Sequence, residues 1–174
     1  MTKKSANDNK TFKKSDYVVY PAHGVGRVVG VEKESVAGFD IEVYVVSFEQ
    51  DKMTLRVPTA KATAAGMRPL ASDDVLKDAL KTLKGKPKVK RTMWSRRAQE
   101  YEAKINSGDL ISIAEVVRDL HRGDDQPEQS YSERQLYESA LDRMARELAA
   151  VENIDKTDAM EKLAKSLAKK KVAA

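Results

Sequence analysis

The pattern of apolar and polar positions changes character near Leu70. Before that residue, short segments rich in valine and tyrosine alternate with glycine-containing turns, which is typical of β-strands. The predicted strands are residues 17–20, 26–33, 41–49 and 53–58, with turns at His23-Gly24, Ala37-Gly38 and Gln50-Asp51. So few strands in about 55 residues cannot form a large sandwich, so we expect a small, strongly bent barrel of the SH3 or Tudor type.

After Leu70 the apolar positions recur at helical spacing. The predicted helices are residues 73–83, 92–106 and 110–122, a long helix that follows Ser130 and ends near residue 153, and residues 157–170. Ser72, Asp109 and Ser130 stand where N-cap residues belong. In the third helix we expect Glu115, Arg118 and Asp119 near the outside. The fold class that follows is α+β: a Tudor/SH3-like β-barrel and then an all-α domain.

Four segments follow from these patterns and from the distribution of charge. Residues 1–14 form a flexible basic extension, 15–70 the barrel, 71–155 the helical domain, and 156–174 a lysine-rich helix and tail. Residues 1–14 are polar and unlike a signal peptide. No apolar run approaches the roughly 18 residues that a membrane span needs. We therefore expect a cytoplasmic protein without a membrane partner.

Composition excludes several kinds of chemistry. The 174 residues include no cysteine and two histidines, which excludes disulfides, thiol nucleophiles and cysteine zinc sites. Gly24, Gly26 and Gly30 superficially resemble a phosphate loop, but a strand follows them where such a loop needs a helix. We expect these glycines to serve a tight turn and a close backbone approach. We predict neither a cofactor nor an enzymatic activity.

The net charge of +5 is unevenly distributed. Residues 84–97 contain seven basic residues and no acidic one, which indicates a local footprint for phosphates. They are Lys84, Lys86, Lys88, Lys90, Arg91, Arg96 and Arg97. A solvated linker and a flexible phosphate clamp both fit the first part of this segment.

Four motifs occur in a distinctive order. They are D-Y-V-V-Y-P-A-H-G-V-G (16–26), T-L-R-V-P (54–58), M-W-S-R-R (93–97) and I-A-E-V-V-R-D-L-H-R (113–122). Together they resemble the CarD/CdnL family of bacterial transcription regulators over roughly residues 12–153. The resemblance implies a Tudor-like domain that binds the RNA polymerase β subunit. It also implies a helical domain that contacts promoter DNA at the upstream edge of the transcription bubble.

The resemblance assigns the polymerase contact to the strand with Arg56. Alternation along this strand places Arg56 and Leu55 on opposite faces. The candidate polymerase-binding residues are Arg56, Leu55 and Arg27. The alternative for Arg56 is an ordinary exposed arginine, and we favour the interface because a rigidly held arginine suits carboxylate partners.

Trp94 is the single tryptophan, and polar or charged residues flank it on both sides. Large aromatic residues usually belong to the core. The resemblance implies a wedge against a base step of DNA, which we favour here. The candidate DNA-binding residues are Trp94, Arg91, Arg96, Arg97, Lys88 and Lys90.

We therefore predict a regulator that binds the polymerase β subunit and stabilises the open promoter complex through largely sequence-independent DNA contacts. The alternative is an autonomous Tudor/KOW-like nucleic-acid-binding protein that acts without polymerase. A separate hypothesis concerns Ala173 and Ala174, which resemble the ends that ATP-dependent proteases recognise. An inert chain end fits those residues equally well.

Overall fold

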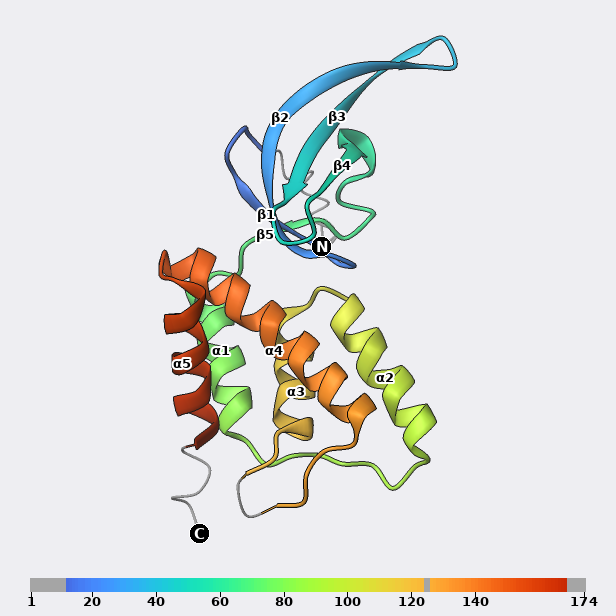
Figure 1. Cartoon of the computed structure of the whole chain (residues 1–174). Helices are drawn as coiled ribbons and strands as arrows, with labels where there is room; N and C mark the ends of the chain where they lie inside the picture. The colour runs from blue at the N-terminus through green and yellow to red at the C-terminus, as the bar shows by residue number, and fades with distance from the viewer. Residues whose placement is uncertain (1–11, 124–125, 169–174) are drawn as a thin grey trace, which may run out of the picture.

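A computed structural model describes residues 12–123 and 126–168 of the chain. Figure 1 shows a curved sheet with a long protruding arm on one side and a bundle of helices on the other. The sheet is antiparallel and its strand order is β4-β3-β2-β1-β5. Its strands are β1 (Tyr17–Tyr20), β2 (Gly24–Val36), β3 (Phe39–Phe48), β4 (Met53–Pro58) and β5 (Arg68–Pro69), and a short 3-10 helix, η1 (Thr59–Lys61), follows β4.

One apolar core lies on the sheet. Its members come from alternate positions of the strands, as a half-buried sheet requires. Phe12, which we expected within the N-terminal extension, is 7% exposed and belongs to this core. The other buried members are Val18, Val28, Tyr44, Val46, Phe48, Val57, Ala62 and Met67.

The β2–β3 hairpin is longer than the sequence pattern predicts. Its pairing continues from Arg27↔Ser47 to Val36↔Phe39, directly beside the turn. Ala37 and Gly38 have φ values of 51° and 83°, which suit the two-residue turn that matches the twist of a hairpin. Because the turn at Ala37-Gly38 is this tight, the two strands stay paired as an arm that extends beyond the core (Figure 1).

Gly26 confirms the expected close backbone approach. A Cβ atom at this position would lie 2.7 Å from Phe48 Cε1 and 2.8 Å from Val46 Cγ1. Gly24 has a φ of 78° at the first residue of β2, where the turn from β1 ends. Both glycines therefore serve the sheet and its turn.

In the described part of the chain, five helices follow the sheet: α1 (Asp73–Lys84), α2 (Trp94–Asn106), α3 (Leu110–Leu120), α4 (Tyr131–Glu152) and α5 (Lys156–Ala168). The three predicted N-caps are confirmed. Ser72 accepts from Val75 N, Asp109 from Ser112 N and Ser130 from Glu133 N. Each cap satisfies a backbone N–H that the first helical turn leaves without an intrahelical partner.

The helices share a second core, to which α5 contributes Ala159, Leu163 and Leu167. The expectation that Arg118 and Asp119 lie near the outside was wrong, because Arg118 is 9% exposed and the Asp119 side chain is 4% exposed. Arg118 Nε donates to Asp119 Oδ1 at 2.9 Å, and the same oxygen accepts from the backbone N of Lys88 at 2.9 Å. The segment after α1 therefore lies against α3 and covers the Arg118 side chain.

Some expectations fall outside the described residues. They concern most of the basic extension, the end of the last helix near residue 170, and the Ala173-Ala174 terminus. Within residues 12–123 and 126–168, none of the helices is long and apolar enough to cross a membrane.

Candidate functional site

Arg56 lies on β4, an edge strand of the sheet, and its side chain is 49% exposed. Its Nη1 donates to Glu32 Oε2 at 2.8 Å and also to Glu34 on β2. These carboxylates raise the pKa of Arg56 from its ordinary value, so the guanidinium stays charged. Glu32 and Glu34 hold Arg56 over the surface of the sheet, with half of the side chain still open to a partner.

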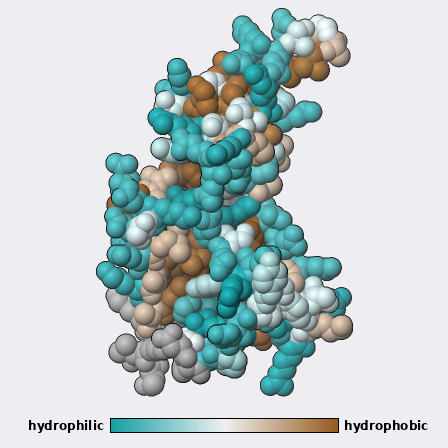
Figure 2. Space-filling model, in the orientation of Figure 1, coloured by the Kyte–Doolittle hydropathy of each residue, from teal (hydrophilic) through white to brown (hydrophobic). Residues whose placement is uncertain are grey.

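Exposed apolar side chains share this face. The register pairs Val45 with Arg56, Ile41 with Glu34 and Val36 with Phe39, and alternate residues of β3 point to one side. Phe39 is 74% and Val36 52% exposed, and Figure 2 shows hydrophobic surface at the end of the arm. We call this surface the Arg56 face; it consists of Glu32, Glu34, Val36, Phe39, Ile41 and Arg56.

The structure separates the other two candidate polymerase-binding residues from the Arg56 face. Leu55 packs against the core of the sheet, as the predicted alternation with Arg56 requires. Arg27 places its guanidinium 5.5 Å from the centre of the Tyr17 ring. Arg27 also lines a cleft of about 320 Å³ between the sheet and the C-terminal part of α4, where Arg146 lies.

Trp94 is the first residue of α2 and is partly buried. Its burial is therefore intermediate between that of a fully exposed wedge and that of a core residue. The ring packs against the helical core, with its centre 6.3 Å from that of Tyr101. Its Nε1 donates to Ser132 Oγ at 3.0 Å, and the Arg97 guanidinium lies 5.4 Å from its centre. The indole is therefore held in one orientation at the end of the helical domain.

The basic candidates differ in their surroundings. Arg91 and Arg96 are exposed, and Lys88 and Lys90 are exposed in the segment before α2. Lys90 Nζ lies 3.4 Å from Glu100 Oε2, a weak contact between two exposed groups. Arg97 is partly buried and stacks on both Trp94 and Tyr101, so its guanidinium supports the aromatic rings.

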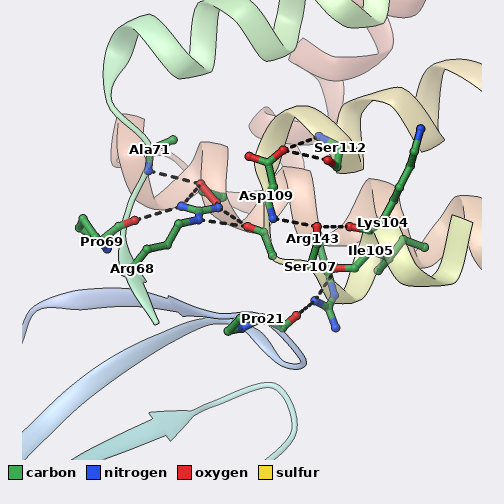
Figure 3. Close-up of polar contacts among 12 residues, drawn as sticks. Pro21, Arg68, Pro69, Ala71, Lys104, Ile105, Ser107, Asp109, Ser112 and Arg143 are labelled. Atoms are coloured by element: carbon green, nitrogen blue, oxygen red, sulfur yellow. Dashed lines mark hydrogen bonds and ion pairs between the residues drawn. The ribbon is translucent and has the colours of Figure 1, made fainter. Parts of the chain in front are cut away.

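One turn of α4 connects the helical domain to the sheet (Figure 3). Arg143 donates from Nη1 to the Pro21 carbonyl at 2.6 Å and from Nη2 to the Ala22 carbonyl at 2.6 Å. Nη1 also lies 3.2 Å from the Ile105 carbonyl. Burial lowers the pKa of Arg143, and the nearby charge of Arg146 lowers it further. Arg143 thus fixes the β1–β2 turn against α2 and α4.

Glu147, one helical turn further on, makes the second connection. It is 3% exposed and accepts from Arg68 of β5 and from the backbone N of Ala71 at 3.3 Å. Arg68 also donates to the Gly108 carbonyl, from Nε at 3.0 Å and from Nη2 at 2.7 Å. We call Arg68, Arg143 and Glu147 with their partners the domain junction (Figure 3).

Sequence reasoning did not identify the domain junction. A signal was present, because Arg143 and Glu147 are four residues apart and flank the buried Met144, Ala145 and Leu148. Charged residues beside buried positions of a helix indicate buried polar partners, since an unpaired buried charge is costly. The sequence does not specify that those partners lie in the other domain.

An exposed sheet face with apolar and charged groups suits a protein partner, and a basic helical end with an aromatic ring suits nucleic acid. The domain junction connects the sheet with its exposed face to the helices that carry the basic end. Residues 12–71 match the CarD-like/TRCF RID domain, and residues 78–164 match the C-terminal domain of CarD.

A relative in Bacillus subtilis (strain 168) is named "Putative transcription factor YdeB". It is 27% identical to this chain over 143 residues, covering 82% of this chain and 94% of the relative. The chain belongs to the CarD family, a family of transcription factors and not a class of enzymes. Its RID domain indicates an interaction with RNA polymerase in general.

Proposed function

We propose that this protein binds the β subunit of RNA polymerase and stabilises the open promoter complex by contacting DNA at the upstream edge of the bubble. The polymerase contact is assigned to the Arg56 face. The DNA contact is assigned to the start of α2, with Trp94 and the exposed basic residues around it. The contribution of Arg27 to polymerase binding stays a prediction from the sequence.

The Arg56 face has the composition of a protein interface. An arginine beside exposed apolar side chains is typical of the residues that contribute most to binding. Since β4 is an edge strand, it also presents backbone groups that a strand of a partner can pair with. These features support docking of a protein on the Arg56 face, which continues along the β2–β3 arm.

The start of α2 has the composition of a DNA contact. Lys88, Arg91 and Arg96 are exposed and can neutralise phosphates without reading sequence. Trp94 is held by Ser132 and Arg97, so the exposed part of the ring needs little further ordering to pack against a base step.

The domain junction is the observation that carries this proposal. Because Arg68, Arg143 and Glu147 connect the sheet to the helices, binding at the Arg56 face fixes where the start of α2 lies. A weak DNA contact then acts at high effective concentration at promoters occupied by polymerase. A modest number of basic residues is sufficient under this arrangement.

The experiment compares Arg56→Glu with Lys33→Glu. Lys33 pairs with Glu42 and points to the opposite face of the same arm, so it is the matched charge reversal. Arg56→Glu is expected to abolish capture of the β subunit and to remove the effect on open-complex half-life, while Lys33→Glu keeps both. Arg56→Gln is included because a glutamate would stand beside Glu32 and Glu34 and could loosen the arm.

Circular dichroism and melting establish that each variant is folded. If folded Arg56→Glu and Arg56→Gln proteins capture polymerase as well as wild type does, the assignment of the polymerase contact to the Arg56 face is wrong. Wild-type effects on open-complex half-life without any binding to the β subunit would favour an autonomous nucleic-acid-binding protein instead.

A further inference from the structure

A second aromatic residue, Tyr131, immediately precedes Ser132, which is the hydrogen-bond partner of Trp94. Tyr131 is the first residue of α4 and is 77% exposed. Helices α2 and α4 begin at the same end of the helical domain (Figure 1), and the Trp94 Nε1 bond to Ser132 Oγ joins their first turns. Met93, immediately before α2, is also 77% exposed.

Tyr131 contributes little to the fold. Its hydroxyl accepts from Gln135 Nε2 at 2.6 Å, one turn along the same helix, so the ring is held on the outside of α4. Tyr137 of the same helix is different: it is partly buried and its hydroxyl lies 2.9 Å from His121 Nδ1. An exposed and locally oriented aromatic ring is a common feature of binding surfaces.

The charges around this end of the domain favour an anionic partner. The exposed cations Lys88, Arg91 and Arg96 lie before or within the first turn of α2, and Arg134 lies within the first turn of α4. The acidic Glu133 is engaged by Arg122, with Nη2 and Oε2 3.3 Å apart, while Glu128 is exposed before the helix. Cations interleaved with aromatic rings are typical of surfaces that bind single-stranded nucleic acid.

We propose that Tyr131 stacks on an unpaired base at the junction between duplex and single-stranded DNA, beside the Trp94 contact. The inference rests on the proposed function and adds a second base-contacting residue to it. The occupant is DNA and not protein, because phosphates complement the surrounding cations and a base complements the ring. Two aromatic rings at one end of the domain suit the two sides of a fork, one duplex and one unpaired.

The test uses the full chain with RNA polymerase on a promoter that carries 2-aminopurine at the unpaired upstream edge of the bubble. Stacking changes the emission of this base analogue. Tyr131→Ala is expected to lose the emission change and to shorten the open-complex half-life about tenfold, the order that one base stack supplies. Tyr131→Phe keeps the ring and is expected to keep most of both effects.

Ser139→Ala is the matched control, because Ser139 is exposed on the same helix about two turns further on. It should behave like wild type in both measurements. The melting temperature of Tyr131→Ala is expected to stay at the wild-type value, since the ring is exposed.

Three results would overturn the inference. Wild-type emission and half-life in Tyr131→Ala, together with a shortened half-life in Trp94→Ala, would reject Tyr131 and leave the proposed function standing. Reduced polymerase binding by Tyr131→Ala would show that the ring contacts protein. Wild-type half-lives in both Trp94→Ala and Arg56→Glu would reject the proposed function, and the Tyr131 inference with it.

Discussion

Arg68 and Glu147 form a two-point contact between the sheet and the helices, with Nη2 2.6 Å from Oε1 and Nη1 3.2 Å from Oε2. Two parallel N–H···O bonds fix orientation as well as distance. Glu147 is almost fully buried, whereas Arg68 keeps 28% of its side chain exposed. The carboxylate therefore depends on Arg68 more than Arg68 depends on the carboxylate.

Removing this carboxylate should weaken both the fold and the connection between its parts. Glu147→Ala removes the carboxylate that accepts from Arg68 and from the Ala71 N–H, while Arg68 keeps its bonds to the Gly108 carbonyl. We expect a loss of about 1–3 kcal/mol in the free energy of unfolding. Urea denaturation measures the loss. Small-angle scattering should show a broader distribution of shapes, and an unchanged profile would remove the connecting role.

Trp94→Ala should lower the stability of the fold moderately and shorten the open-complex half-life strongly. Because the ring is partly buried, we expect a cost of about 1–3 kcal/mol, below the roughly 3–5 kcal/mol of a fully buried aromatic residue. The open-complex half-life should fall while binding to the β subunit persists. Trp94→Phe restores part of the packing without the Nε1 bond to Ser132, so its half-life separates the ring from that bond.

Arg96→Ala and Arg97→Ala should differ in their effects on stability and on DNA binding, although the two residues are adjacent in the sequence. Arg96 is exposed, so its loss should leave melting unchanged and lower the salt-dependence slope of DNA binding by about one. Arg97 stacks on Trp94 and Tyr101, so its loss should lower stability by about 0.5–2 kcal/mol. Melting and salt titrations of both variants test this, and identical behaviour would contradict it.

Gly26→Ala should destabilise the sheet domain, and Gly30→Ala is its matched control on the same strand. A methyl group at Gly26 overlaps Phe48 and Val46, an overpacking that costs about 1–3 kcal/mol. Nothing lies within 4 Å of a Cβ at Gly30, so that variant should stay within about 0.5 kcal/mol of wild type. Chemical denaturation decides between them.

Phe39→Ser should reduce affinity for the polymerase β subunit at least about fivefold, which corresponds to roughly 1 kcal/mol at an interface. Its high exposure means that melting should not change. Val31→Ser is the control, because Val31 pairs with Tyr44 on the opposite face of the arm. Equal losses in the two variants would show that the arm binds without preference for the Arg56 face.

Local patterns predicted much of the fold. The caps at Ser72, Asp109 and Ser130 and the turn at Ala37-Gly38 depend on neighbouring residues alone, and the structure confirms them. The two-residue strand β5 has no periodicity of its own, because it exists through its pairing with β1. Short elements formed by distant pairing are therefore beyond what local patterns contain.

The sequence predicts where the candidate site residues lie on strands and helices, but it does not predict which residues surround them. The alternation of Leu55 and Arg56 follows from the period of a strand, but the partnership of Arg56 with Glu32 and Glu34 follows from the register of three strands. Polar neighbours of Trp94 in the sequence suggested an open ring. The partners that partly bury it, Tyr101 and Ser132, come from a later helical turn and another helix.

Arg143 binds the carbonyls of Pro21 and Ala22, so the sheet and the helices share a fixed frame. Under the proposed function, the Arg56 face rests on polymerase, and the start of α2 then lies at a fixed distance and angle from it. B-DNA advances 3.4 Å along each strand per base. Shifting the bubble edge by one or two bases would therefore move the fork away from the start of α2. Such a protein would discriminate among promoters by the position of the melted region, even where it reads no base.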